Sequence, residues 1–410
     1  MVDKIKVSSD LISGDVDTGY GKVADAFRAN FAGGREAGAA FAVYRDGVKV
    51  VDLWGGYRNA QTAAPWNRDT MVNMFSSTKG VAALTIALAV SRGLFGYEDL
   101  VAQHWPEFAQ AGKEHITVRQ LLGHQAGLPA LTAAPRLADV AQPDRLAPML
   151  AAQKPAWRPG TRHGYHTVSL GWYESELIRR TDPHGRTLGR YFADEIAAPL
   201  GLDVYIGLPD SVSRERLAQL HQFSRTRAAL HVKVMPLGLI AASLNPIGLF
   251  LRSTRLPADV APWEGDYNRD PVRAVEIPSG NGIGTAESVA KLYGAAATAD
   301  ATLGLSTAVL GELAAMPPAP SRGERDKVLG VNCRFSLGLS KSGFDLIFGS
   351  SDAAYGTPGF GGSFGFADPD TGIGYAYVMN RLGFHLYSDP REFALRQALF
   401  SDALGARPQR

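Results

Sequence analysis

Met71-Val72-Asn73-Met74-Phe75-Ser76-Ser77-Thr78-Lys79 marks the point at which this 410-residue chain changes from strand-like to helical patterns. Met71 to Phe75 reads as a short buried strand, and Gly80 to Phe95 is a long apolar run of helical length. Helical patterns with Pro- and Gly-rich loops then continue to about residue 220. The position of this stretch divides the chain into strand-rich ends and a helical middle.

Both ends of the chain carry strand signals. Residues 18–32 have apolar side chains at helical spacing and stop at Gly33-Gly34. Ala39 to Trp54 then alternates around Asp46-Gly47, which is typical of a β-hairpin. Near the other end, short apolar runs are separated by turns: 334–339, 345–349, 361–367 and 372–379, before a closing helix over 390–404.

Strands at both ends predict an α+β fold in which one antiparallel sheet, flanked by helices, is built from the two ends of the chain. We expect residues 1–75 and 276–410 to form one discontinuous α/β domain. Residues 76–275 then form a mostly helical lobe, with an irregular and very apolar insert at 221–275. A ligand pocket is expected between the lobes.

Composition excludes several functional classes. The 42 basic and 40 acidic side chains leave a net charge of +2 without a like-charged block, so no nucleic acid or membrane surface is indicated as a partner. The N-terminal residues have no apolar signal region, and the apolar runs 81–90 and 237–251 are too short or too interrupted to span a bilayer. We therefore expect a cytoplasmic protein. A homo-oligomer is compatible with the sequence.

The numbers and spacing of cysteines and histidines bear on disulfide bonds and metal sites. The single Cys333 excludes an internal disulfide, and its apolar neighbours predict a buried structural thiol on a strand. Nine histidines occur without a metal-ligand spacing, so we expect neither a metal nor a cofactor.

The motif Ser76-x-x-Lys79 is the first candidate nucleophile. Side chains at i and i+3 share a helix face, and a desolvated lysine can act as the base that a serine hydroxyl needs. The same spacing recurs at Ser288 and Lys291, where Thr285 predicts an ordinary helix N-cap. Gly361-Gly362-Ser363-Phe364-Gly365 matches the nucleophile-elbow pattern, but strands rather than a helix follow it, which favours a structural serine.

Two further elements follow Ser76 and Lys79 in order. These are Pro159-Gly160-Thr161-Arg162-His163-Gly164-Tyr165-His166-Thr167 and Gly356-Thr357-Pro358-Gly359-Phe360-Gly361-Gly362. With them the chain resembles the serine β-lactamase/penicillin-binding-protein superfamily, in its class C-like branch of family VIII carboxylesterases. Further likeness lies in 115–129, 196–202 and 365–369, so the resemblance runs from about residue 20 to 400.

The resemblance implies that Ser76 is acylated, that Lys79 is its partner, and that Tyr165 shares a proton with Lys79. Which of the two is the base stays open, because neither amine nor phenol is a good base at its ordinary pKa. Tyr173, which also begins a Tyr-x-Ser pattern, lies on the following predicted helix, so Tyr165 is preferred. The resemblance also implies an oxyanion hole formed by the backbone N–H groups of Ser76 and Phe360.

Departures from the family pattern favour an ester as substrate. Thr357-Pro358-Gly359 replaces Lys-Thr-Gly, so the cation that engages a substrate carboxylate is missing, and Thr167 replaces the usual Asn or Ser. We expect Thr357, Gly359, Phe360 and Thr167 to contact a small-molecule ester. The alternatives are an amide hydrolase of the same superfamily (a weak β-lactamase, a D-peptidase or a hydrolase of linear amide oligomers) and a non-catalytic binding protein on this fold.

The insert allows two interpretations. Met235 to Ile240 and Ile247 to Leu251, with Trp263 and Tyr267 beyond, could line an acyl pocket or form the core of the helical lobe. His163 and His166 flank Tyr165, but a histidine in a turn is more often structural, so neither is included in the catalytic set.

Overall fold

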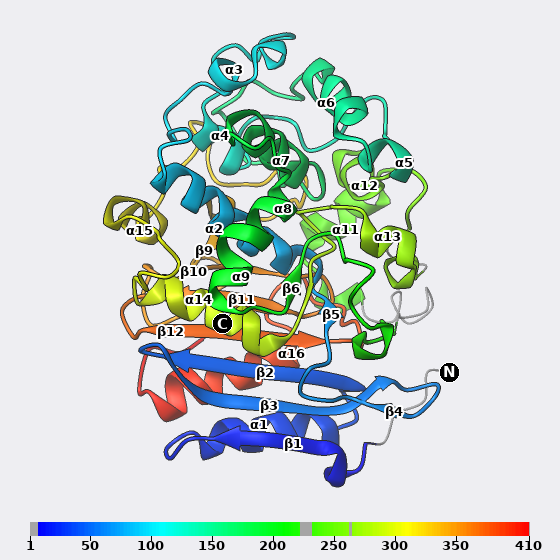
Figure 1. Ribbon diagram of the computed structural model, residues 1–410, viewed down its shortest axis with the longest axis vertical. Coiled ribbons are helices and arrows are strands. Elements are labelled where there is room, and N and C mark those ends of the chain that lie inside the picture. Colours follow the sequence, from blue (N-terminus) through cyan, green and yellow to red (C-terminus); the bar gives the residue numbers. More distant parts are fainter. Residues whose placement is uncertain (1–6, 222–231, 262–264, 410) are drawn as a thin grey trace.

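The structure, a computed structural model, describes residues 7–221, 232–261 and 265–409. It confirms the predicted α+β fold: Figure 1 shows a sheet of strands from both chain ends below a mostly helical part. The sheet has the order β1-β3-β2-β12-β11-β10-β9-β8, and β4 pairs with β3 outside this order. All its pairings are antiparallel.

The strands come from two distant segments that meet in the middle of the sheet. The N-terminal strands are β1 (Ile12–Val16), β2 (Gly38–Arg45), β3 (Val48–Asn59) and β4 (Ala64–Pro65). The C-terminal strands are β8 (Phe335–Ser336), β9 (Leu339–Lys341), β10 (Tyr355–Pro358), β11 (Phe364–Asp368) and β12 (Ile373–Met379). The two segments are joined where β12 pairs with β2, from Ile373↔Arg45 to Met379↔Ala39.

Helices cover both faces of the sheet, and β12 shows why. Its residues point alternately to the two faces, and a Cβ at Gly374 would lie 2.1 Å from the backbone N of Gly294 in α14 (Ala286–Ala297). Small residues thus let α14 approach that face closely. On the other face the Tyr375 hydroxyl donates to the Glu392 carboxylate of α16 (Pro390–Gln397), which packs beside α1 (Gly21–Ala32).

The helical part surrounds one apolar helix, α2 (Thr78–Ser91), which is buried on all sides up to Ala89. A helix that is apolar all round belongs in a core. The other helices of this part are α3 (Val101–His104), α4 (Val118–Leu122), α5 (Leu137–Val140), α6 (Pro143–Ala152), α7 (Ser169–Thr181), α8 (Leu188–Phe192), α9 (Ala198–Leu200), α11 (Leu237–Leu244), α12 (Leu249–Thr254), α13 (Asp270–Ala274) and α15 (Thr307–Ala314). None of the helices in the described ranges is long and apolar enough to cross a membrane.

A small second sheet holds the segment before α2. Its order is β5-β7-β6, from Val72–Asn73, Ile283–Gly284 and Val204–Tyr205. Met74 N–H also donates to the Gly282 carbonyl, 2.9 Å away. The chain entering α2 is therefore fixed to the loop before β7, which is more than 200 residues further on.

The structure corrects some of the predicted elements. Residues 345–349 form no strand, because this segment makes only an isolated bridge between Gly343 and Leu346. Cys333 is buried, as predicted, but it lies in a loop before β8 instead of on a strand. Strands β1, β4, β6, β7 and β10 were not predicted, and the single run predicted over 334–339 is divided between β8 and β9. The division into domains at 75/76 and 275/276 stays a prediction.

Candidate active site

Ser76 lies in the 3-10 turn Phe75–Ser77 that leads directly into α2. Every residue from Thr70 to Ala89 is buried except Ser76, which is partly exposed. The preceding Phe75 has φ +48°, in the left-handed region that a bulky side chain rarely adopts. Such strain persists only where surrounding contacts enforce it, and it is common at functional sites.

The strained turn is held by side-chain hydrogen bonds on both sides. Phe75 N–H donates to Asn73 Oδ1 at 3.0 Å, and Thr78 Oγ1 donates to the Phe75 carbonyl at 2.5 Å. Thr78 Oγ1 also accepts from Gly282 N–H at 2.9 Å. These bonds fix the backbone around Ser76 without using its own side chain.

Lys79 is fully buried, and its Nζ lies 3.3 Å from Ser76 Oγ, 2.6 Å from the Thr167 carbonyl and 2.9 Å from the Ser279 carbonyl. A neutral amine has two N–H donors and one lone pair. The two carbonyls take the two donors, so the lone pair faces the Ser76 hydroxyl. Burial lowers the pKa of Lys79 to about 7, and Glu174 opposes this shift. The free amine is therefore well populated at neutral pH.

Glu174 on α7 is the acid that influences Lys79. It is fully buried, and neither carboxylate oxygen has a hydrogen-bond partner in the structure. Oε1 lies 3.2 Å from the position of a Cβ built on Gly338, and Ala83, one turn beyond Lys79 on α2, lies 3.0 Å from the same position. Burial raises the pKa of Glu174 to about 8, against the effect of Lys79. A buried carboxyl group without hydrogen-bond donors lowers the stability of the fold. In this site its effect on Lys79 is electrostatic.

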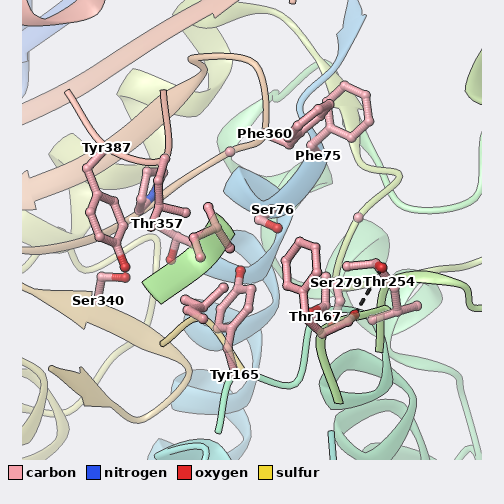
Figure 2. Close-up of a pocket in the computed structure, with 18 of the residues that line it drawn as sticks. Phe75, Ser76, Tyr165, Thr167, Thr254, Ser279, Ser340, Thr357, Phe360 and Tyr387 are labelled. Atoms are coloured by element: carbon pink, nitrogen blue, oxygen red, sulfur yellow. Dashed lines mark hydrogen bonds between the residues drawn. The ribbon is translucent and has the colours of Figure 1, made fainter. Parts of the chain in front are cut away.

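Tyr165 approaches Ser76 from the loop before α7. Figure 2 shows its hydroxyl pointing toward Ser76, and the Lys79 Nζ lies 4.8 Å from its ring centre. Burial raises the pKa of the Tyr165 phenol well above its usual range, although its hydrogen bond with Ser76 lowers it. The phenol consequently keeps its proton at neutral pH.

Asp326 fixes the Tyr165 loop. Its Oδ2 accepts from Tyr165 N–H at 2.8 Å, while Oδ1 accepts from Val328 and Leu329 N–H at 2.8 Å each. Burial raises the pKa of Asp326 to about 6, against the effect of these three backbone donors. One buried carboxyl thus joins the Tyr165 loop to the segment that leads into β8.

Two neutral histidines pack beneath Tyr165. His124 Nδ1 accepts from His166 N–H at 3.0 Å, and His166 Nε2 accepts from Leu128 N–H at 3.1 Å. Burial lowers the pKa of His166 to about 3, so its ring stays neutral and donates from Nδ1 to His124. The rings of His124 and Phe335 lie 4.9 and 5.5 Å from that of Tyr165. The histidines position the tyrosine and carry no charge.

The third sequence element, residues 356–362, forms the wall of the site opposite Thr167. A Cβ at Gly359 would lie 2.1 Å from Ser363 Oγ and 2.4 Å from the Met74 carbonyl, so only glycine fits there. Ser363 Oγ donates to that same carbonyl at 2.8 Å and lies 3.1 Å from Ser77 Oγ. Ser363 therefore holds the turn after β10 against the nucleophile turn and does not line the pocket.

A cavity of about 300 Å³ opens onto Ser76. None of the side chains that line it is Lys, Arg, Asp or Glu in the part of the chain that the structure describes. The lining is apolar and aromatic with a few hydroxyls and the His385 imidazole, and Figure 2 shows Ser76 between Thr357 on one side and Thr167 on the other. The cavity therefore suits a neutral, largely apolar ligand.

Of the predicted site residues, Ser76, Tyr165, Thr167, Thr357, Gly359 and Phe360 all line this cavity, and Lys79 lies directly behind Ser76. Met235, Leu239, Ser243, Phe250, Thr254 and Tyr267 supply the wall from the insert, so the acyl-pocket interpretation fits these residues. Other apolar residues of the insert, Leu237, Leu244 and Ile247, are exposed, so they form neither a pocket wall nor a core. Trp263 lies outside the described residues.

The competing motifs lie elsewhere. Tyr173 is fully buried among aromatic rings and donates to the Leu150 carbonyl at 3.3 Å. Thr285 caps α14 as predicted, and Ser288 Oγ accepts from Asp203 N–H at 3.0 Å. Lys291 donates to the Leu200 carbonyl at 2.6 Å.

The sequence did not predict three residues of the site: Ser279, Glu174 and Asp326. The only signal for Ser279 was the turn-forming composition of 278–282.

The chain is similar to known proteins over most of its length. Residues 23–400 match the family model described as Beta-lactamase. The chain is 33% identical over 375 residues to the esterase/beta-lactamase LipL of Mycobacterium tuberculosis (strain ATCC 25618 / H37Rv), covering 90% of this chain and 83% of the relative.

The chain also superposes on solved structures of similar proteins. A family VIII carboxylesterase superposes with a TM-score of 0.81 at 36% identity, covering 94% of this chain and 98% of the other. A penicillin-binding protein homolog from Caulobacter crescentus superposes with a TM-score of 0.81 at 37% identity, covering 95% and 98%.

Proposed function

Because the chain belongs to the beta-lactamase family of serine hydrolases, we propose that it cleaves neutral carboxylic esters through an acyl-enzyme formed on Ser76. The observation that carries this proposal is the placement of Lys79: its Nζ lies 3.3 Å from Ser76 Oγ, and in the neutral amine two backbone carbonyls take both N–H donors, which leaves the lone pair for the Ser76 proton. A serine hydroxyl that acts as a nucleophile needs such a partner to take its proton.

In the acylation step, the Ser76 proton passes to Lys79 Nζ while Oγ attacks the ester carbonyl. The N-terminus of α2 adds a positive dipole that favours the developing negative charge. The backbone N–H groups of Ser76 and Phe360 are the proposed donors to the carbonyl oxygen of the tetrahedral intermediate.

Collapse of that intermediate needs a proton for the leaving alcohol. Tyr165 suits this role because its phenol stays protonated, lies beside Ser76 and has Lys79 next to its ring. The phenol donates its proton to the leaving oxygen and recovers one from the Lys79 ammonium. Water then hydrolyses the acyl-enzyme by the reverse sequence of proton transfers.

The cavity supports an ester instead of an anionic β-lactam or peptide. Its described lining offers no lysine or arginine to a substrate carboxylate, and Pro358 stands where a backbone donor would otherwise be. Burying an unpaired carboxylate costs several kcal/mol, so charged substrates bind weakly. Thr357 Oγ1 is buried without a hydrogen-bond partner and can donate to a neutral ester oxygen.

The test compares rates on a neutral p-nitrophenyl ester and a chromogenic cephalosporin. We expect burst kinetics on the ester, a kcat/KM at least about a thousandfold lower on the cephalosporin, and loss of both with Ser76→Ala. A cephalosporin rate equal to the ester rate would instead support the amide-hydrolase alternative, for which the esterase/beta-lactamase relative is a precedent. Full activity in Ser76→Ala would exclude the mechanism.

A further inference from the structure

Exposed apolar side chains gather on one short segment of the insert. Seven large apolar residues are exposed among the described residues, and four of them lie between Val234 and Ile247. Leu237 is 85% exposed, Leu244 76% and Ile247 82%. A contiguous cluster of this kind on a soluble fold marks an interaction surface.

Helix α11 connects this cluster to the cavity. Leu237, Ala241 and Leu244 follow the i, i+4, i+7 spacing of one helix face, and all three are exposed. Leu239 and Ser243 lie on the opposite face and line the cavity. One helix, about 10 Å thick, therefore separates the cavity from the outer apolar face.

Cations accompany the apolar face. Lys233, Arg252 and Arg255 are exposed and make no ion pair with any described residue. The only acid between residues 232 and 261 is Asp259, which pairs with Arg136. The balanced charge of the whole chain therefore conceals a local positive excess. Figure 1 shows α11 and α12, which carries Arg252, close together in the helical part.

We propose that the apolar face of α11, defined as Val234, Leu237, Leu244 and Ile247, docks this protein on an anionic lipid surface, from which apolar esters enter the cavity. The entry of esters from this surface rests on the proposed function. Apolar side chains enter the acyl boundary, while the neighbouring cations meet anionic headgroups. This differs from the expectation drawn from overall charge, which indicated no membrane partner.

A second copy of the chain fits this face less well. A symmetric dimer sets the same patch of each subunit against itself. Lys233, Arg252 and Arg255 would then lie near their own symmetry mates with no acid to neutralise them. Like charges brought together in a desolvated interface oppose association.

Binding is measured by cosedimentation of the Ser76→Ala protein with phosphatidylcholine vesicles, with and without phosphatidylglycerol, so that turnover plays no part. We expect binding that requires phosphatidylglycerol and weakens with salt. The triple variant Leu237→Ser/Leu244→Ser/Ile247→Ser should bind at least about a hundredfold more weakly. The triple variant Lys233→Gln/Arg252→Gln/Arg255→Gln should bind these vesicles about a hundredfold more weakly than the parent protein.

Val48→Ser is the matched control, because Val48 is 61% exposed but starts β3, far from the insert. It should bind as the parent does. Absence of binding to anionic vesicles, or equal binding by the apolar triple variant, overturns the inference. So does a dimer that the triple variant abolishes in sedimentation velocity while vesicles stay unbound.

Activity separates this inference from the proposed function. With Ser76 intact, the apolar triple variant should hydrolyse a soluble short-chain ester within about twofold of the wild-type rate and a vesicle-embedded ester at least tenfold more slowly. If the wild type binds vesicles but hydrolyses no ester, the proposed function fails and the docking surface stands. If it hydrolyses the soluble ester but ignores vesicles, the docking surface fails alone.

Discussion

Lowering the pH from 8 to 5 should remove activity by protonating Lys79. Its pKa of about 7 leaves the amine neutral in ~90% of molecules at pH 8 and ~1% at pH 5. Since the neutral amine is the base for Ser76, kcat/KM should fall about ninetyfold, with a limiting slope of one below pH 7. The assay is initial-rate hydrolysis of a neutral p-nitrophenyl ester, followed at the isosbestic wavelength of nitrophenol and its anion.

Glu174→Gln is the informative control for that profile. Ionised Glu174 raises the pKa of Lys79, but its own pKa of about 8 leaves it mostly protonated over the acid limb, so Glu174→Gln should leave that limb near pH 7 and change the plateau rate little. Intrinsic fluorescence at pH 5 checks that the fold persists while Asp326, with a pKa of about 6, becomes protonated. A profile that is flat from pH 5 to 8, or a limb that rises only near pH 10, would refute Lys79 as the base.

Three substitutions test the parts around the base. Tyr165→Phe should lower kcat by about 10²–10⁴ with little change in KM, measured on an ester with a poor leaving group; an unchanged kcat would contradict its role as proton donor. Asp326→Asn should lower the free energy of unfolding by about 1–3 kcal/mol in urea and should reduce kcat, because its amide would point a donor at Tyr165 N–H. Unaltered stability would show that this contact is dispensable. Gly359→Ala should destabilise the fold by about 1–3 kcal/mol in thermal unfolding, because its Cβ would overlap the Met74 carbonyl; a neutral effect would mean that the turn moves freely.

The fold and the chemical centre could be predicted because their signals are local. The Asp46-Gly47 hairpin, the Gly33-Gly34 stop and the apolar run after Lys79 each specify one element. Tyr165 was placed beside Ser76 only through the resemblance, since nothing within the sequence brings positions 89 residues apart together.

The residues that tune the centre gave no such signal. Glu174 sits in an ordinary helical pattern, and only its burial beside α2 makes it unusual. Asp326 acts through backbone donors of Tyr165, Val328 and Leu329, which no side-chain pattern reveals. The strand predicted at 345–349 was wrong because an apolar run alone does not specify pairing: this segment makes only the bridge between Gly343 and Leu346.

The most direct test of the account identifies the atom that becomes acylated. The protein is treated with a fluorophosphonate at pH 8, digested and mapped by mass spectrometry, alongside Lys79→Met as a comparison. We predict one adduct per chain, on Ser76, formed at least about a hundredfold more slowly in Lys79→Met. An adduct on Ser363 or Ser288, or none on the wild-type protein, would contradict it.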